Sequence, residues 1–280
     1  MSPFREASLT ALREIRRNLG STKGIAMFVL FVLGGSVPSL LELAAVKLLG
    51  RDPTQGMSPD DQRMLLEQGL ARVYPEETAK HLSYCPPILF LLFQLTLFFA
   101  PFFVLLIGFD QIAGDIQHRA IRYIAGRSRR ESIVVGKALG VWAVISVMLL
   151  VLHITVWIVV AATGTTTAAA LLSWGPRIWL FSVAACASFA GLTGLISSFF
   201  RTPIVALLVG VVVFVALWII AKIFGWIEAT KVAAWALPFK YEDLVVSHQP
   251  LRVLGGIGAY IGWGAVMTAA ASLVVKRRDI

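Results

Sequence analysis

Six long apolar runs alternate with polar segments along the chain. They cover residues 24–46, 86–109, 134–162, 178–200, 203–224 and 251–275. A helix needs about 20 apolar residues to cross the hydrocarbon core of a bilayer, and each run reaches that length. None of the runs shows the period-two alternation of a membrane β-barrel. The pattern predicts an all-α polytopic membrane protein with six transmembrane helices, in a single domain that covers residues 1–280.

The polar segment before the first run, residues 1–23, predicts an amphipathic helix at the membrane interface. One face at helical spacing consists of Phe4, Ser8, Leu12, Ile15 and Leu19. Four arginines occupy other faces, and a helix of this composition lies flat on a membrane. The segment is too long for the polar lead of a signal peptide, and no small-residue cleavage site follows the first apolar run. We therefore expect an elbow helix that leads into the first span.

Two polar segments on the other side of the membrane also predict structure. Residues 50–85 form a long excursion in which Ser58-Pro59-Asp60 is typical of a helix start. Residues 225–250 mix apolar and charged positions, and are too short to span. They favour a re-entrant or interfacial pair of short helices that is broken at Pro238, with a juxtamembrane cap as the simpler alternative.

Composition agrees with a membrane protein and excludes a soluble domain in addition to the membrane domain. The chain is 58% hydrophobic and 15% charged, with a mean hydropathy of +0.79. Soluble domains are about 25% charged. No polar-patterned stretch reaches the roughly 100 residues that a soluble domain requires.

The distribution of charge predicts the orientation. The segments on the side of the two termini are residues 1–23, 110–137, Arg201 and 276–280, and together they hold 15 basic and 6 acidic residues. The rest of the chain holds 10 of each. Basic residues concentrate on the cytoplasmic side of membrane proteins, so both termini are expected in the cytoplasm. We expect the protein itself in the cell (inner or plasma) membrane. Contact with anionic lipid explains the basic pI without nucleic-acid binding.

Motifs for catalysis or for tightly bound cofactors are missing. The sequence has no GxxxxGK[ST] phosphate loop, no HExxH and no GxSxG. Neither Cys85 nor Cys186 has the spacing of a metal ligand. We expect no catalytic residue, no metal and no cofactor on this chain.

A few polar or backbone-breaking residues in or beside the spans are candidates for a pathway or for packing: Gln94, His153 and Pro238. A lone histidine in a span more often makes an interhelical hydrogen bond than a proton relay. No acidic residue lies at the depth of His153, which disfavours a proton-coupled secondary carrier.

Small residues four positions apart allow helices to cross closely. The pairs are Ala187 with Gly191, Ala190 with Gly194, and Gly258 with Gly262. They serve either packing within one subunit or a dimer seam, and the sequence leaves both open.

The polar loop between the second and third spans has an internal order beyond its charge. Residues 110–137 read DQIAGDIQHRAIRYIAGRSRRESIVVGK and carry six basic residues. Asp115 is followed by mixed basic and apolar residues, a turn at Gly126, the pair Arg129-Arg130, and Gly136-Lys137 at the entry to the next span. This order resembles that of permease subunits of type-2 ABC exporters. The elbow helix, the six spans and the basic tail are similar too.

The resemblance implies that residues 110–133 form a coupling loop that docks on a separate ATP-binding subunit. The docking residues would be Asp115, Arg119, Arg122, Arg129, Arg130 and Lys137. ATP and Mg²⁺ would be bound by that partner, and the permease would pair with a second copy or with a sibling permease. Arg119-Ala120 and Gly126-Arg127 depart from the Gly-Thr and Pro-containing turn of many relatives, which implies a particular partner.

Two other functions remain open from the residues alone. The chain could be a non-transporting membrane anchor or scaffold that recruits a cytoplasmic protein through the 110–133 loop. It could also be a secondary carrier that uses His153. The substrate is not encoded in any recognisable motif.

Overall fold

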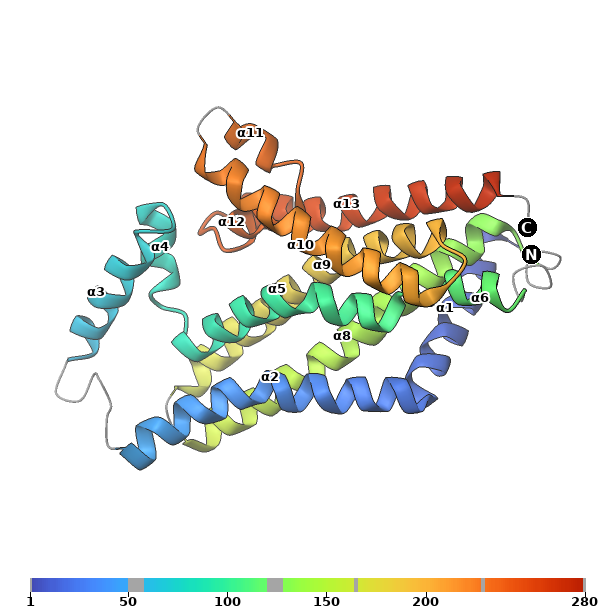
Figure 1. The fold of residues 1–280 in the computed structure, drawn as a ribbon. Helices are drawn as coiled ribbons and strands as arrows, with labels where there is room; N and C mark the ends of the chain where they lie inside the picture. Colours follow the sequence, from blue (N-terminus) through green and yellow to red (C-terminus); the bar gives the residue numbers. More distant parts are fainter. Residues whose placement is uncertain (1, 50–57, 120–127, 164–165, 228–229, 279–280) are drawn as a thin grey trace.

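The computed structural model describes residues 2–49, 58–119, 128–163, 166–227 and 230–278, and all regular elements in these ranges are helical (Figure 1). The long helices are α2 (Thr22–Leu49), α5 (Pro87–Gly108), α8 (Arg130–Thr163), α9 (Ala168–Phe199), α10 (Pro203–Trp226) and α13 (Pro250–Arg277). They run side by side as one elongated bundle. The predicted all-α class is confirmed.

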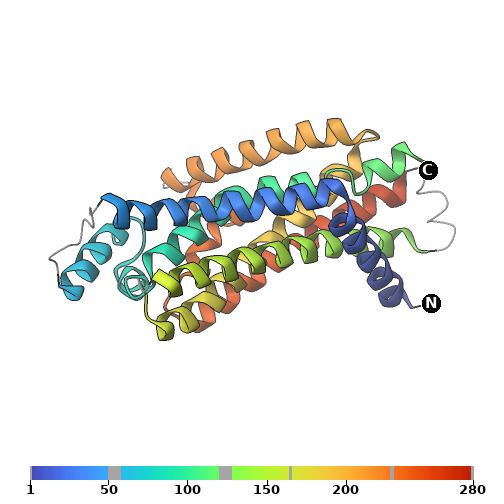
Figure 2. The same cartoon turned by 90° about the horizontal axis from the view of Figure 1, so that it is seen from below.

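The predicted spans agree with these helices. In the described ranges, α5, α8, α9, α10 and α13 are long and apolar enough to cross a membrane. The sixth candidate is α2, which follows α1 (Pro3–Gly20) after a bend of 74°. Figure 2 shows α1 turned across the end of the bundle. The bundle therefore provides up to six spans, and α1 is the expected elbow.

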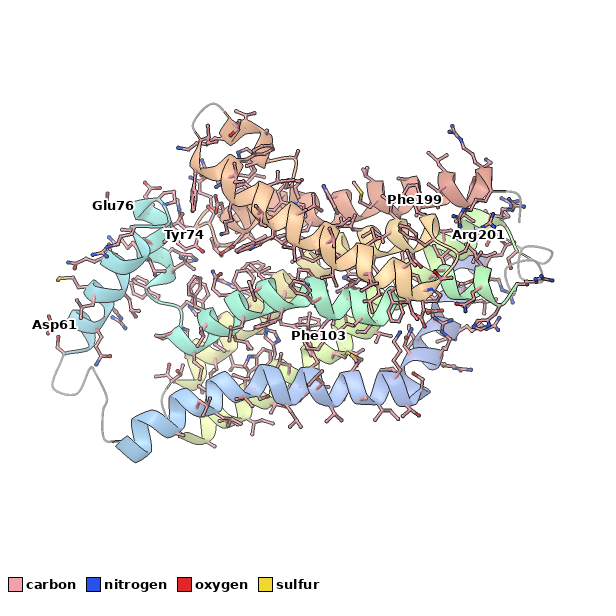
Figure 3. The ribbon with its side chains drawn as sticks, viewed as in Figure 1. Asp61, Tyr74, Glu76, Phe103, Phe199 and Arg201 are labelled. Carbon is pink, nitrogen blue, oxygen red and sulfur yellow. The ribbon has the colours of Figure 1, made fainter. Side chains whose placement is uncertain are left out.

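The two ends of the bundle differ in their elements. Both termini, α1 and the short helix α6 (Ala113–Gln117) lie at one end, called here the terminal end (Figure 1). The opposite end carries α3 (Pro59–Leu70), α4 (Glu76–Leu82), α11 (Lys231–Ala234), the 3-10 turn η2 (Pro238–Lys240) and α12 (Glu242–Val245). In Figure 3, Tyr74 and Glu76 mark the opposite end, whereas Phe199 and Arg201 mark the terminal end.

Helix α9 forms the centre of the bundle. Most of it is buried, whereas α10 and α13 are largely exposed. It crosses α13 so closely that neither helix has room for a side chain at the crossing. A Cβ atom at Gly191 would lie 2.2 Å from the Gly264 carbonyl oxygen, and one at Gly264 would lie 2.4 Å from the Ala187 carbonyl oxygen. The pair Ala187 with Gly191 therefore packs within the subunit. Gly258 and Gly262 have no atom within 4 Å of their Cβ positions.

The polar excursions at the opposite end are anchored to the spans. Ser58 caps α3 and forms a capping box with Asp61, as its sequence indicates. The Tyr74 hydroxyl donates to Glu242 Oε1 (2.5 Å), and Gln94 Nε2 donates to the same oxygen (2.6 Å). Burial raises the pKa of Tyr74, so the phenol keeps the proton that it donates. These bonds join the 58–85 excursion, α5 and α12.

The close crossing of α9 and α13 generates a prediction about stability. Gly264→Val is expected to lower the free energy of unfolding by about 1–3 kcal/mol, because the added atoms overlap the backbone of α9 and the core is overpacked. Gly262→Val, two residues away on the open side of α13, is the control and is expected to have little effect. The free energies of unfolding of both variants can be measured by denaturant titration in detergent micelles, with circular dichroism as the signal. Equal losses for the two variants would contradict the observed packing.

Candidate functional site

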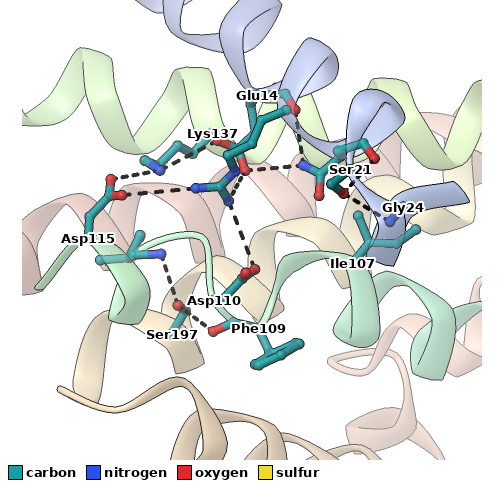
Figure 4. A network of polar contacts seen from close by, with 12 residues as sticks. Glu14, Ser21, Gly24, Ile107, Phe109, Asp110, Asp115, Lys137 and Ser197 are labelled. Atoms are coloured by element: carbon teal, nitrogen blue, oxygen red, sulfur yellow. Dashed lines mark hydrogen bonds and ion pairs between the residues drawn. The ribbon is translucent and has the colours of Figure 1, made fainter. Parts of the chain in front are cut away.

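Three carboxylates and three cations meet at the terminal end (Figure 4). They come from α1, α2, α8, α6 and the turn between α5 and α6, and they are Glu14, Arg17, Lys23, Asp110, Asp115 and Lys137. We call these six residues the charge cluster. Its formal charges balance, which is what burial of ionised groups at this position requires.

Lys137 lies at the inner part of the charge cluster. Its Nζ atom is 2.8 Å from Asp115 Oδ2 and 3.5 Å from Glu14 Oε2. The three side chains are only 5%, 12% and 4% exposed, in the order Lys137, Asp115, Glu14. One ammonium group therefore joins three helices, α8, α6 and α1. Removal of one member would leave the others buried without compensation, which is much more costly than the loss of an exposed pair.

Arg17 and Lys23 form the more exposed part of the charge cluster. Arg17 Nη2 binds Glu14 Oε1 at 2.5 Å and lies 3.9 Å from Asp110 Oδ1. Lys23 Nζ is 3.1 Å from the same Asp110 oxygen and lies 4.1 Å from the centre of the Phe109 ring. Asp110 thus receives one cation from α1 and one from α2. The corner between these two helices is held against the end of α5.

The approach of α1 to α8 depends on two glycines one turn apart. A Cβ atom at Gly136 would lie 2.5 Å from the Ala7 carbonyl oxygen, and one at Gly140 would lie 2.6 Å from Glu14 Cβ. This is the close crossing that a Gly-xxx-Gly sequence permits between membrane helices. It brings Glu14 within reach of Lys137, which is next to Gly136 in the chain.

Helix α6, which opens the predicted coupling loop, is also fixed to the centre of the bundle. The Ser197 hydroxyl of α9 accepts from the backbone N–H groups of Ile112 (3.1 Å) and Ala113 (3.0 Å), and donates to the Phe109 carbonyl (2.8 Å). One hydroxyl therefore satisfies three backbone groups at the turn between α5 and α6. The start of the loop is held by α9 as well as by the charge cluster.

The return of the loop to α8 is bound to α1 and α13. The Arg129 N–H donates to Glu6 Oε2 of α1 (3.1 Å), and this hydrogen bond lowers the pKa of the Glu6 carboxyl. Arg130 Nη1 donates to the carbonyls of Lys276 (3.2 Å) and Arg278 (2.9 Å) at the end of α13. A cation at this position satisfies carbonyls that have no partner within the helix.

The predicted docking residues thus divide into two groups. The side chains of Asp115 and Lys137 are buried in the charge cluster, and that of Arg130 is bound to α13, so none of the three presents a free surface to a partner. Arg119 and Arg129 are exposed, and Arg119 has a positive φ of 57°. Arg122 lies outside the described residues.

Sequence reasoning missed several members of this site, above all Glu14 and Ser197. The amphipathic pattern predicts an interfacial helix and does not identify which polar side chains of α1 contact the other helices. Phe4 is 84% exposed, whereas Glu14 and Asn18 are buried against the bundle. Phe4 and Leu12 on the apolar face are exposed, as suits an interfacial helix, whereas Ile15 and Leu19 are partly buried against the bundle. The spacing Gly136-xxx-Gly140 was the signal in the sequence that could have revealed this crossing.

The other predicted polar or backbone-breaking residues lie apart from the charge cluster. His153 is fully buried, and its Nδ1 lies 2.8 Å from the Leu149 carbonyl oxygen of its own helix. Gln94 binds Glu242, and Pro238 is buried at the start of η2. The described ranges contain no group of three or more His, Cys, Asp or Glu side chains that could hold a metal ion.

The long apolar helices and the polar cluster at one end define a multi-pass membrane protein. Residues 10–279 match the sequence family described as ABC-2 family transporter protein. The match covers nearly the whole chain, so the chain belongs to this family and is a permease subunit of an ABC transporter. The resemblance found in the 110–137 loop is thereby confirmed. No curated protein matches the chain.

The buried position of Lys137 leads to a prediction about stability. Lys137→Met is expected to cost about 3–5 kcal/mol of unfolding free energy, because Glu14 and Asp115 lose their shared cation. Lys276→Met removes a cation paired with Glu131, both more than 60% exposed, and is expected to cost less than about 1 kcal/mol. Denaturant titration of the two variants in the same detergent checks the difference. A Lys137→Met variant as stable as Lys276→Met would contradict the role of the cluster.

Proposed function

We propose that this permease couples ATP hydrolysis on a separate ATP-binding subunit to export of a substrate. The single observation that carries the proposal is the construction of the 110–133 loop. Its base is bound to α1, α8 and α9 by the charge cluster and Ser197, whereas Arg119 and Arg129 are exposed on either side of residues 120–127. A firmly held base with exposed cations suits a surface that receives force from a partner.

The orientation in the membrane follows from charge. The terminal end carries the loop, both termini and the excess of basic residues. The preference of basic residues for the cytoplasmic side supports a cytoplasmic position of this end, where ATP is available. We assign the protein to the cell (inner or plasma) membrane on the same ground.

The path of the force can be traced through named contacts. A displacement of the loop moves α6, which carries Asp115. Asp115 is paired with Lys137 of α8 and lies 4.0 Å from Arg17 of α1. Because α1 continues into α2 through the 74° bend, a movement of α6 is passed to α8 and, through the elbow, to α2. Close-packed elements transmit such displacements because they deform little.

A complete transporter needs a second membrane subunit and two ATP-binding subunits. The exposed apolar faces of α10 and α13 are available for a second copy of this chain or for a sibling permease, as well as for lipid. ATP and Mg²⁺ would be bound by the ATP-binding partner, and no cofactor is assigned to this chain. We assign no nucleic-acid partner either, because topology and lipid contact account for the basic charge.

Arg129 and Arg130 provide a sharp test of docking, because the structure gives them different roles. Arg129→Glu is expected to weaken the complex with the ATP-binding subunit about tenfold, the equivalent of about 1.4 kcal/mol, with only a small loss of thermal stability from repulsion of Glu6. Arg277→Glu, an exposed charge reversal near the C-terminus, is the matched control and should leave affinity within about twofold. The measurement is co-purification with a candidate ATP-binding subunit, together with stimulation of its ATPase activity in nanodiscs.

Arg130→Glu completes the test. It is expected to lower stability, because Arg130 satisfies the carbonyls at the end of α13. Full assembly and ATPase stimulation with Arg129→Glu would contradict docking through this loop. Assembly with the ATP-binding subunit but no ATP-dependent transport in the wild type would favour the anchor or scaffold. Transport that follows a proton gradient without ATP, and that loses this dependence in His153→Asn, would favour the secondary carrier.

A further inference from the structure

A cavity of about 500 Å³ lies at the opposite end of the bundle, between α4, α9 and the start of α13. Its volume is in the range of small-molecule sites, about 300–1,000 Å³. Residues at its walls include His81, Trp174, Arg177, Phe181, His248 and Ile257. None of them belongs to the charge cluster or to the 110–133 loop.

One part of the cavity wall is basic. His81 of α4, Arg177 of α9 and His248 before α13 all line it. Trp174 connects two of them, with its ring 5.0 Å from the His81 ring and 5.7 Å from the Arg177 guanidinium carbon. Burial lowers the pKa of His81, and the charges of Arg177 and His248 lower it further. The three groups therefore share a positive electrostatic environment.

Little negative charge balances this group in the described structure. Glu77 Oε2 lies 3.2 Å from His248 Nε2, but the Glu77 side chain is 77% exposed. No carboxylate of the described residues lies within ion-pair distance of Arg177 or His81. The wall thus offers cationic and hydrogen-bonding groups for an anion.

The remainder of the cavity is apolar and extends along the membrane helices. Phe181 of α9, with Val253 and Ile257 of α13, forms its wall. Leu180 and Leu254 also line it and are 45% and 66% exposed, respectively. Exposed leucines on two spanning helices face the hydrocarbon of a bilayer. The cavity is therefore accessible from the membrane, and a soluble anion would leave its apolar part without contacts.

We propose that this cavity binds one anionic phospholipid from the leaflet at the opposite end. Its phosphate would lie against Arg177, His81 and His248, and one acyl chain would lie between α9 and α13. Charge complementarity accounts for the anionic headgroup, since Arg177 donates charge-assisted hydrogen bonds to phosphate. The apolar wall and its lateral opening account for the acyl chain. The inference does not depend on coupling to ATP, because no residue of the docking loop takes part.

The experiment is native mass spectrometry of the purified, delipidated full chain titrated with phosphatidylglycerol. One retained lipid is expected, with phosphatidylcholine bound at least about tenfold more weakly because its headgroup has no net charge. Arg177→Gln is expected to weaken phosphatidylglycerol binding about tenfold. Arg252→Gln is the matched control, since Arg252 is an exposed cation at the same end but does not line the cavity. It should change binding less than about twofold.

A filling variant tests the apolar part independently. Ile257→Trp is expected to abolish the retained lipid by occupying the space of the acyl chain. Arg177 is exposed, so Arg177→Gln is expected to fold. This variant therefore tests the proposal even if Ile257→Trp does not fold. Equal losses for Arg177→Gln and Arg252→Gln, or equal binding of the two lipids, would overturn the proposal. Complete displacement of the lipid by millimolar inorganic phosphate would also overturn it, because the acyl chain would then contribute nothing.

Discussion

The terminal end of this protein depends on how one buried ammonium group is neutralised. The ammonium group of Lys137 at the start of α8 is buried, and Glu14 of α1 and Asp115 of α6 supply carboxylates to it at ion-pair distance. The electrostatic requirement of α8 therefore determines where the elbow helix and the base of the loop must lie.

Steric complementarity makes these ion pairs possible. Gly136 and Gly140 remove side chains from the face of α8 that α1 crosses, and this allows Glu14 to reach Lys137. The same principle operates deeper in the bundle, where Gly191 and Gly264 bring α9 and α13 into backbone contact. Small residues therefore set the helix spacing at both crossings. At the crossing of α1 and α8, polar side chains then form an ion pair between the two helices.

The two ends of the bundle are organised for different interactions. At the terminal end, the cations of the charge cluster are paired with carboxylates, and Arg119 and Arg129 are exposed beside a firmly held loop. At the opposite end, Arg177 and two histidines border an apolar cavity with little opposing charge. The first arrangement suits a protein partner that applies force, and the second suits a lipid. Helix α9 connects them, because Ser197 lies at one end and Arg177 toward the other.

The sequence by itself determined the helical class, the apolar spans, the elbow and the family. These properties follow from local composition and from periodicity, which neighbouring residues specify. Only the tertiary structure decided that Asp115 and Lys137 are buried, that Arg130 is bound to α13, and that α1 buries Glu14 and Asn18. Glu14 and Lys137 are 123 positions apart. Arg130 and the Arg278 carbonyl that it binds are 148 positions apart. Such pairings depend on which helices are neighbours, and hydrophobic periodicity encodes only the face that each helix buries.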